Sequence, residues 1–192
     1  MSDHPDLRPA ARRLSELVAA VPDDALARPT PCEHYRVGDL LDHIGGLAVA
    51  FAAAARKTPL DGAPSVDAAN LGDDWRPRIS RDLVTMAEAW QDPEAWEGMT
   101  AAGGVDLPGD VAGVVALDEL VLHGWDLAKA TGQPVGYDGP ELEAVYGMVQ
   151  HFRAEDVEGL FGPLVVVADD APLLDRILGV AGRHPDWSPP PR

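Results

Sequence analysis

The sequence predicts an all-α fold: an antiparallel four-helix bundle followed by a C-terminal helical extension. Apolar residues recur every three or four positions in several segments, the spacing that places them on one face of a helix. Alanine is abundant and aromatic residues make up only 6% of the chain, which suits closely packed helices. Strand-like alternation is minimal, and glycine and proline interrupt the periodic segments. These observations favour helices packed on helices.

The first two helices are expected over residues 5–20 and 37–57. Pro22 ends the first helix, because proline cannot donate a helical hydrogen bond. A rigid, proline-rich loop over residues 23–36 leads to the second helix. His43 lies on the apolar face of that second helix, so we expect its imidazole to point inward.

The third and fourth helices are expected over residues 74–91 and 110–131. The segment between them, residues 92–109, is irregular, with an extended stretch at residues 96–100. Gly132 follows the last periodic residue of the fourth helix and is a typical helix terminator.

The C-terminal extension is expected to hold two further helices, over residues 139–154 and 171–182. A mixed connection over residues 155–168 joins them, and part of it is extended. The proline-rich tail, residues 183–192, is expected to be loose or packed as a strap.

The formal net charge is −17, from 32 acidic and 15 basic residues. Phosphate binding needs a basic patch, and the sequence shows none, so we expect no nucleic-acid partner. The acidity also disfavours binding to an anionic membrane surface. It is compatible with a cationic cofactor such as a divalent metal.

The single cysteine, Cys32, excludes an intrachain disulfide. The N-terminal segment lacks the apolar core of a secretory signal, and the longest apolar run, residues 44–55, is too short to span a bilayer. We therefore expect a cytoplasmic protein of one domain. Within it, residues 1–135 form the four-helix bundle, and residues 136–192 form C-terminal helices and a tail packed on that bundle.

The fourth helix contains two residue types that bind metals strongly. Glu119 and His123 are four positions apart, so they lie one turn apart on the same helix face. That face also carries apolar residues, and burying a charge is costly unless it is paired or ligated. His43 on the second helix could supply a third ligand, which would leave one coordination position open for water or substrate. The residues alone nevertheless favour a core histidine hydrogen-bonded to a carboxylate, because this spacing is common by chance.

Other candidate residues are weaker. Asp126, three positions after His123, could accept a hydrogen bond from a ligating imidazole, or could instead pair with Lys129 or solvent. Cys32 and His34 share a loop and suggest a cysteine nucleophile, but packing is the favoured role for Cys32. Phosphate loops, dinucleotide fingerprints, nucleophile elbows and Cys-x-x-Cys pairs are absent.

Three segments, in order, resemble one known family: PTPCEHYRVGDLLDHIGG, LDELVLHGWDLAKATGQP and FGPLVVVADDAPLLDRILGVAGRHPDW. The chain resembles the DinB/YfiT-like metalloenzymes. More narrowly, it is similar to the actinobacterial group related to the N-terminal metal-binding domain of mycothiol-dependent maleylpyruvate isomerase. This resemblance implies a four-helix bundle with a divalent metal, most often zinc, held by His43, Glu119 and His123.

The chain departs from the family pattern in two places. Tyr35 stands where the family usually has Trp, and Arg36 where it usually has Ser or Thr. The second change removes the expected N-cap of the second helix and leaves Asp39 without its capping-box partner. The separate C-terminal domain of the isomerase is expected to have no counterpart here, so isomerisation of maleylpyruvate does not transfer from the resemblance.

These inferences give a leading hypothesis and an alternative. The leading hypothesis is a metalloenzyme in which zinc, or nickel, iron or manganese, activates a mycothiol-type thiol. The thiolate would attack a small electrophile in a transferase or isomerase reaction. The alternative is a non-catalytic metal-binding regulatory or interaction protein, a possible homodimer through a surface that includes Trp75, Trp90 and Trp125. A bundle that has lost its metal is a third possibility.

Overall fold

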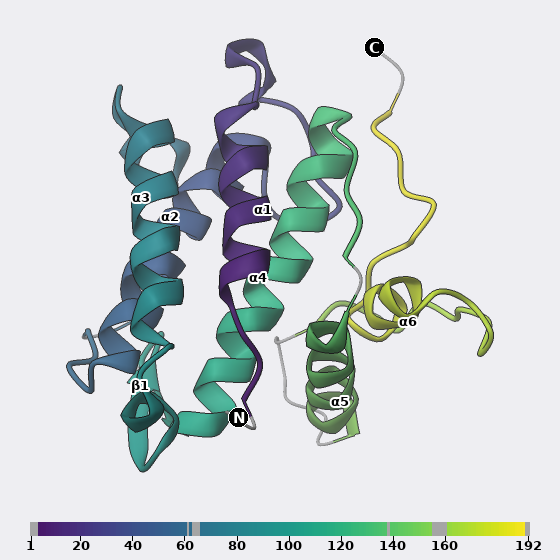
Figure 1. Ribbon diagram of the computed structural model, residues 1–192. Helices are drawn as coiled ribbons and strands as arrows, with labels where there is room; N and C mark the ends of the chain where they lie inside the picture. The colour runs from purple at the N-terminus through teal and green to yellow at the C-terminus, as the bar shows by residue number, and fades with distance from the viewer. Residues whose placement is uncertain (1–3, 61, 63–65, 138, 155–160, 191–192) are drawn as a thin grey trace.

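Four helices form the bundle that the sequence predicts (Figure 1). The computed structural model describes residues 4–60, 62, 66–137, 139–154 and 161–190. The bundle helices are α1 (Arg8–Ala19), α2 (Val37–Ala55), α3 (Trp75–Ala89) and α4 (Gly109–Thr131).

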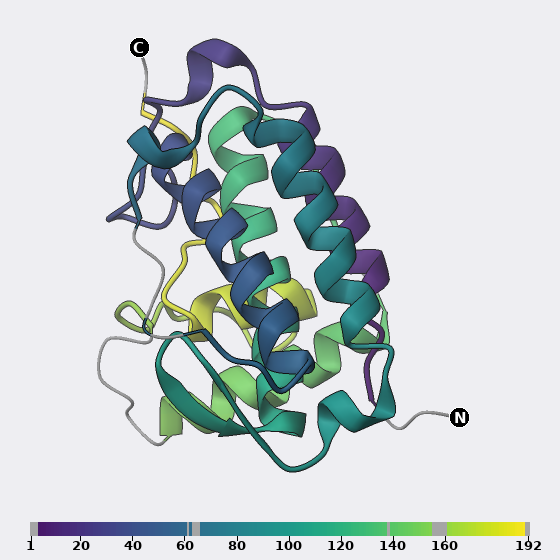
Figure 2. The same ribbon diagram turned by 90° about the vertical axis from the view of Figure 1, so that its left-hand side faces the viewer.

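Around the bundle the helices follow the order α1, α3, α2, α4, and each packs against two neighbours. The end of α2 lies near the end of α3, because Lys57 Nζ donates to the carbonyl oxygens of Ala95 and Glu97. The ends of α1 and α4 also meet, since the Gln133 amide donates to the carbonyl oxygen of Leu17 at 3.0 Å. Thus α2 and α3 run parallel, side by side (Figure 2), as do α1 and α4. The predicted antiparallel relation holds for the α1–α3 and α2–α4 contacts.

Small residues allow the close approach of α2 and α3. Gly45 faces α3 so closely that a Cβ there would lie 3.2 Å from Ile79 Cγ1. By length and composition α2 could cross a membrane, but most of it is buried, as in the core helix of a globular protein. The apolar residues of α2 therefore serve the bundle core.

The fourth helix has the predicted limits. It begins at Gly109, directly after Pro108, and it ends at Thr131. Gly132 adopts a left-handed backbone with φ of 72°, which a glycine tolerates without strain. The 23-residue α4 is consequently long enough to touch the bundle, the C-terminal helices and the site described below.

A short hairpin occupies the segment that the sequence analysis treated as irregular. Strand β1 (Met99–Ala102) pairs antiparallel with β2 (Val105–Pro108). Gly103 and Gly104 form the turn with φ of 60° and 82°, as a two-residue hairpin requires. The Thr100 hydroxyl donates to the carbonyl oxygen of Ala54 at 2.7 Å, which ties the hairpin to the end of α2. The Gly-Gly pair was the available sequence signal for this turn.

The C-terminal extension packs on the outside of the bundle, beside α4 (Figure 1). It contains α5 (Pro140–Ala154) and α6 (Leu173–Val180), which contact each other. Arg153 Nε donates to the carbonyl oxygen of Val180 at 3.0 Å. The first part of the tail is packed as a strap, because Lys129 Nζ donates to the carbonyl oxygen of Pro185 and Arg183 is largely buried, whereas residues 188–190 are exposed.

Two details differ from expectation. Trp75, Trp90 and Trp125 are at most 5% exposed, so the surface proposed for a homodimer on these residues is wrong. Their large rings fill the core instead. The capping box at α2 is lost only in part: Arg36 supplies no side-chain cap, but Asp39 Oδ2 accepts a hydrogen bond from the Arg36 backbone N–H at 3.0 Å.

Replacing Gly113 by Ala is expected to destabilise the protein by about 1–3 kcal/mol. The new methyl group would overlap the ring of Trp96, which is 5% exposed and packed on α4. Urea denaturation followed by tryptophan fluorescence measures the free energy of unfolding. Gly147→Ala in α5 is the matched control: its added methyl meets open space, and it should stabilise the helix by about 0.5–1 kcal/mol. Equal effects of the two substitutions would contradict this packing.

Candidate metal centre

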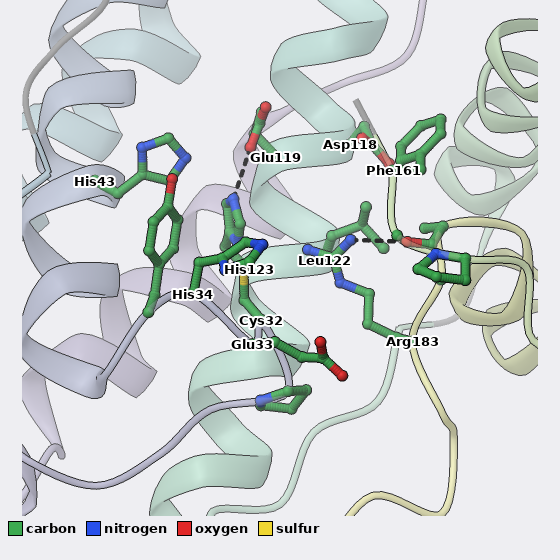
Figure 3. A pocket seen from close by; sticks show the side chains of 16 residues that line it. Cys32, Glu33, His34, His43, Asp118, Glu119, Leu122, His123, Phe161 and Arg183 are labelled. Atoms are coloured by element: carbon green, nitrogen blue, oxygen red, sulfur yellow. Dashed lines mark hydrogen bonds and ion pairs between the residues drawn. The ribbon is translucent and has the colours of Figure 1, made fainter. Parts of the chain in front are cut away.

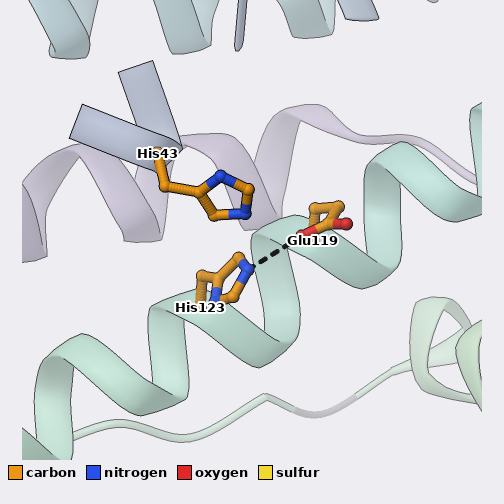
Figure 4. A group of neighbouring side chains, drawn as sticks. All are labelled: His43, Glu119 and His123. Atoms are coloured by element: carbon orange, nitrogen blue, oxygen red, sulfur yellow. Dashed lines mark ion pairs between the residues drawn. The ribbon is translucent and has the colours of Figure 1, made fainter. Parts of the chain in front are cut away.

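The three predicted ligand residues meet between α2 and α4 (Figure 4). His43, Glu119 and His123 each offer a ligand atom, and these atoms all lie within 4.8 Å of one another. His123 Nε2 lies 2.9 Å from Glu119 Oε2, and the rings of His43 and His123 are 4.9 Å apart between centroids. The structure thus brings together residues that are far apart in the sequence.

The packing of the helices explains this placement. Glu119 and His123 are one turn apart on α4, and Leu122 beside them is 3% exposed. Ile44, next to His43 on α2, is 2% exposed. Because α2 and α4 pack against each other and these apolar neighbours are buried, the polar residues beside them are turned inward as well.

Buried carboxylates determine the charge of His123. Its Nδ1 lies 3.1 Å from Asp126 Oδ2, and the side chain of Asp126 is fully buried. Burial alone would lower the pKa of His123, but the hydrogen bonds to Asp126 and Glu119 outweigh it and raise that pKa to about 9. The metal-free site therefore holds an imidazolium between two carboxylates.

His43 behaves in the opposite way. Burial, together with the neighbouring His123, lowers the pKa of His43 to about 4, so its imidazole is neutral at pH 7. Its buried Nδ1 has no hydrogen-bond partner. Neutral imidazole is the form that binds metals.

Arg183 is a residue of this region that the sequence analysis placed in the tail. Its guanidinium donates to Asp126 Oδ2 at 3.0 Å, and its charge and that of His123 lower the pKa of Asp126 although burial would raise it. The alternative pairing of Asp126 with Lys129 is wrong, because Lys129 donates to Pro185. Asp126 is therefore placed to orient the His123 ring, as the sequence analysis proposed. Arg183 and Asp126 are 57 positions apart in the sequence, so no local pattern could reveal this ion pair.

The donor set fits a divalent cation. Two imidazoles and one carboxylate are the nitrogen and oxygen ligands that zinc, nickel, iron and manganese accept. The ring of His43 lies edge-to-face with that of His123, with 4.9 Å between centroids, so a nitrogen of each imidazole can reach one ion together with Glu119. Both observations agree with a metal site at His43, Glu119 and His123.

A cavity of about 480 Å³ opens over the three residues (Figure 3). Its walls come from the loop before α2, from α4, and from the C-terminal segments at residues 161–163 and 181–183. The loop is held by Thr30, whose hydroxyl contacts the carbonyl oxygens of Cys32 and Tyr35 at 2.9 and 2.7 Å. The volume is in the range of small-molecule binding pockets.

Cys32 and Asp118 both line this cavity. Burial, and then the charge of Asp126, raise the pKa of Cys32 to about 11, so its thiol is protonated at pH 7 and is a poor nucleophile. Asp118 was missed by the sequence analysis. It is 5% exposed, and burial followed by the charge of Glu119 raises its pKa well above the usual range.

Comparison with known proteins identifies relatives of both the sequence and the fold. The family model described as "Mycothiol maleylpyruvate isomerase N-terminal domain" matches residues 7–128. The uncharacterized proteins Rv0738 and MT0763, from two strains of Mycobacterium tuberculosis, are each 32% identical over 136 residues. These alignments cover 66% of this chain and 65% of each relative, so the chain spans less than two thirds of their length.

The crystal structure of the mycothiol-dependent maleylpyruvate isomerase has a similar fold, with a TM-score of 0.70 at 16% identity. The crystal structure of a mutant of that isomerase matches with a TM-score of 0.68. The likeness covers 94% of this chain and 88% of the isomerase chain. The expectation that the C-terminal part of the isomerase has no counterpart here is therefore wrong as regards the fold, which continues through α5 and α6.

Zinc binding at pH 7 is expected to release about one proton per chain. His123, with a pKa of about 9, is protonated before binding, whereas His43, with a pKa of about 4, is already neutral. Calorimetric titrations in buffers of different protonation enthalpy count the proton, and the affinity should fall as the pH is lowered. Zinc binding without proton release would show that His123 is not protonated before the metal binds.

In the protein without metal, the pKa of His123 is raised above the value of about 6.5 that it has in the unfolded chain. The protonated form of His123 therefore stabilises the fold fully below a pH of about 6.5, and this stabilisation is lost as the pH rises through about 9.

Replacing Asp126 by Asn is expected to weaken zinc binding about 10- to 100-fold, because the ligand His123 loses its charged hydrogen-bond acceptor. Competition with a chromophoric chelator measures the affinity. Asp110→Asn, at an exposed position in the first turn of the same helix, controls for the change of charge and should bind as the wild type does. Unchanged affinity in a folded Asp126→Asn protein would show that Asp126 does not position the ligand.

Proposed function

Since this chain belongs to the family of the mycothiol maleylpyruvate isomerase N-terminal domain, we propose that it is a divalent-metal enzyme that acts on a low-molecular-weight thiol of the mycothiol type. The observation that carries the proposal is the open cavity above His43, Glu119 and His123. Three protein ligands and an adjoining cavity are typical of catalytic metal sites, whereas structural sites are closed by four ligands.

The protein residues would divide the work between binding and positioning. His43, Glu119 and His123 would hold the metal, and Asp126 would fix the orientation of the His123 ring. A bound divalent ion supplies Lewis acidity, which favours the thiolate form of a thiol at neutral pH. Arg183 balances the buried charge of Asp126, so that Asp126 remains ionised.

The cavity walls would control what reaches the thiolate. Cys32 and Tyr35 on the loop, and Phe161 opposite, limit the access of water and leave room for a small electrophile. The thiolate sulfur would form a bond to the electrophilic carbon as a π bond of the electrophile opens and the adjacent atom takes up the proton that the thiol lost, as in a transferase. In an isomerase the same carbon–sulfur bond would then break and the π bond would form again. Because Cys32 is protonated at pH 7, the nucleophile in this proposal comes from the ligand rather than from the protein.

The alternative of a non-catalytic metal-binding protein has less support. A binding module would require a closed, saturated metal or an exposed apolar face. The tryptophans that suggested such a face are buried, and the cavity gives a ligand access to the three metal-binding residues. The geometry consequently favours turnover.

The purified, untagged protein is expected to carry about one metal ion per chain after incubation with zinc. His43→Ala and His123→Ala should each lose it, because each substitution removes one imidazole ligand. Elemental analysis measures the metal content, and circular dichroism verifies that the variants fold. The metal-loaded wild type should then either consume mycothiol together with a small electrophile, as a transferase does, or convert the electrophile at constant mycothiol concentration, as an isomerase does.

His34→Ala is the matched control for the two ligand variants. His34 lines the same cavity but is not one of the three clustered residues, so its removal should leave the metal content unchanged. Absence of metal from the wild type, or full metal content in both ligand variants, would overturn the proposed site.

A further inference from the structure

The cavity contains a polar side chain that the metal site does not use. Asp118 precedes Glu119 on α4, is 5% exposed, and lines the cavity. Its buried Oδ1 has no hydrogen-bond partner. Among the described residues, two of the three buried side-chain atoms without a partner, Asp118 Oδ1 and His43 Nδ1, belong to residues that line this one cavity.

An unpartnered buried carboxyl oxygen is costly to the fold, because its hydrogen bonds to water are lost and not replaced. Arg183 attracts the carboxylate of Asp118 but does not donate a hydrogen bond to it. Arg183 directs its hydrogen bonds to Asp126 and to the carbonyl oxygen of Ala181 instead. An apolar side chain at position 118 would suit the protein alone better, so the carboxyl group of Asp118 points to a ligand.

We propose that Asp118 forms a polar subsite that binds a hydroxyl or amide group of the thiol cosubstrate, at a distance from its sulfur. The inference rests on the proposed function and adds to it a residue that selects the thiol. A hydroxyl group both donates and accepts hydrogen bonds, so it can satisfy a carboxyl group in either protonation state.

The shape of the cavity supports two separate points of attachment. In the view of Figure 3, Asp118 and Phe161 both lie on the side of the cavity away from His43. A ligand whose sulfur lies at the three clustered residues would therefore have to extend along the cavity to reach Asp118. The volume of about 480 Å³ accommodates a hydroxylated thiol much larger than its sulfur-bearing end. Phe161 provides an apolar surface beside the same subsite.

The test compares two thiols on the zinc-loaded full chain. Mycothiol carries hydroxyl and amide groups, whereas butane-1-thiol carries neither. Replacing Asp118 by Leu, which has a similar shape, should weaken mycothiol binding about tenfold and change butane-1-thiol binding by less than about twofold. Asp118→Asn keeps a polar group of the same size and should retain mycothiol affinity to within about threefold. Calorimetry measures both affinities, and elemental analysis verifies equal zinc content.

A readout without ligand separates this role from a structural one. The ligand-free Asp118→Leu protein should unfold at the same temperature as the wild type or higher, because a buried unsatisfied group has been removed. Equal mycothiol affinity in wild type and Asp118→Leu, or an equal loss for both thiols, would overturn the subsite. Failure of the zinc-loaded wild type to bind either thiol would instead overturn the proposed function itself.

Discussion

The charged residues that α4 carries into the interior, Glu119, His123 and Asp126, constrain how the rest of the protein packs. His123 lies between the carboxylates of Glu119 and Asp126. The carboxylate of Asp126 is fully buried and also pairs with the guanidinium of Arg183, which offsets its charge. Removing one member of such a group leaves an uncompensated charge in the interior. Since Arg183 follows α6, the C-terminal segment must pack against α4 before the charges balance. The site and the extension are therefore parts of one arrangement.

This arrangement gives each imidazole a different starting state. His123 is charged in the metal-free protein because carboxylates surround it, and His43, which faces His123, is neutral. A metal ion would replace the proton of His123 as the positive charge between Glu119 and Asp126. In the proposed function, a cation would thus take the place of a proton on His123, and the two packed helices α2 and α4 would hold its ligands.

The helical bundle and most of the candidate site were predictable from the sequence, because both depend on helical spacing. Apolar residues recur at helical spacing most clearly in α1, whereas α2 and α4 are long and rich in buried apolar residues, and Gly132 ends α4 where a left-handed residue is needed. The cluster of His43, Glu119 and His123 was predictable because helical spacing places Glu119 near His123 and the apolar face of α2 turns His43 inward, and the family resemblance pointed to the same three residues. Asp118 and Arg183 were not predictable, since burial of the first and the long-range pairing of the second arise only when the extension folds back. The hairpin was missed because its strands have four residues each and little alternation.

We propose that His43, Glu119 and His123 bind one metal ion, and that one coordination position of this ion is open to the sulfur of a thiol. The most direct measurement is the visible and near-ultraviolet absorption of the cobalt-substituted protein during titration with mycothiol. We expect a sulfur-to-cobalt charge-transfer band that grows to one equivalent of thiol and is missing from His123→Ala, which has lost one of these ligands. A cobalt-loaded wild type whose spectrum does not respond to the thiol would contradict the claim.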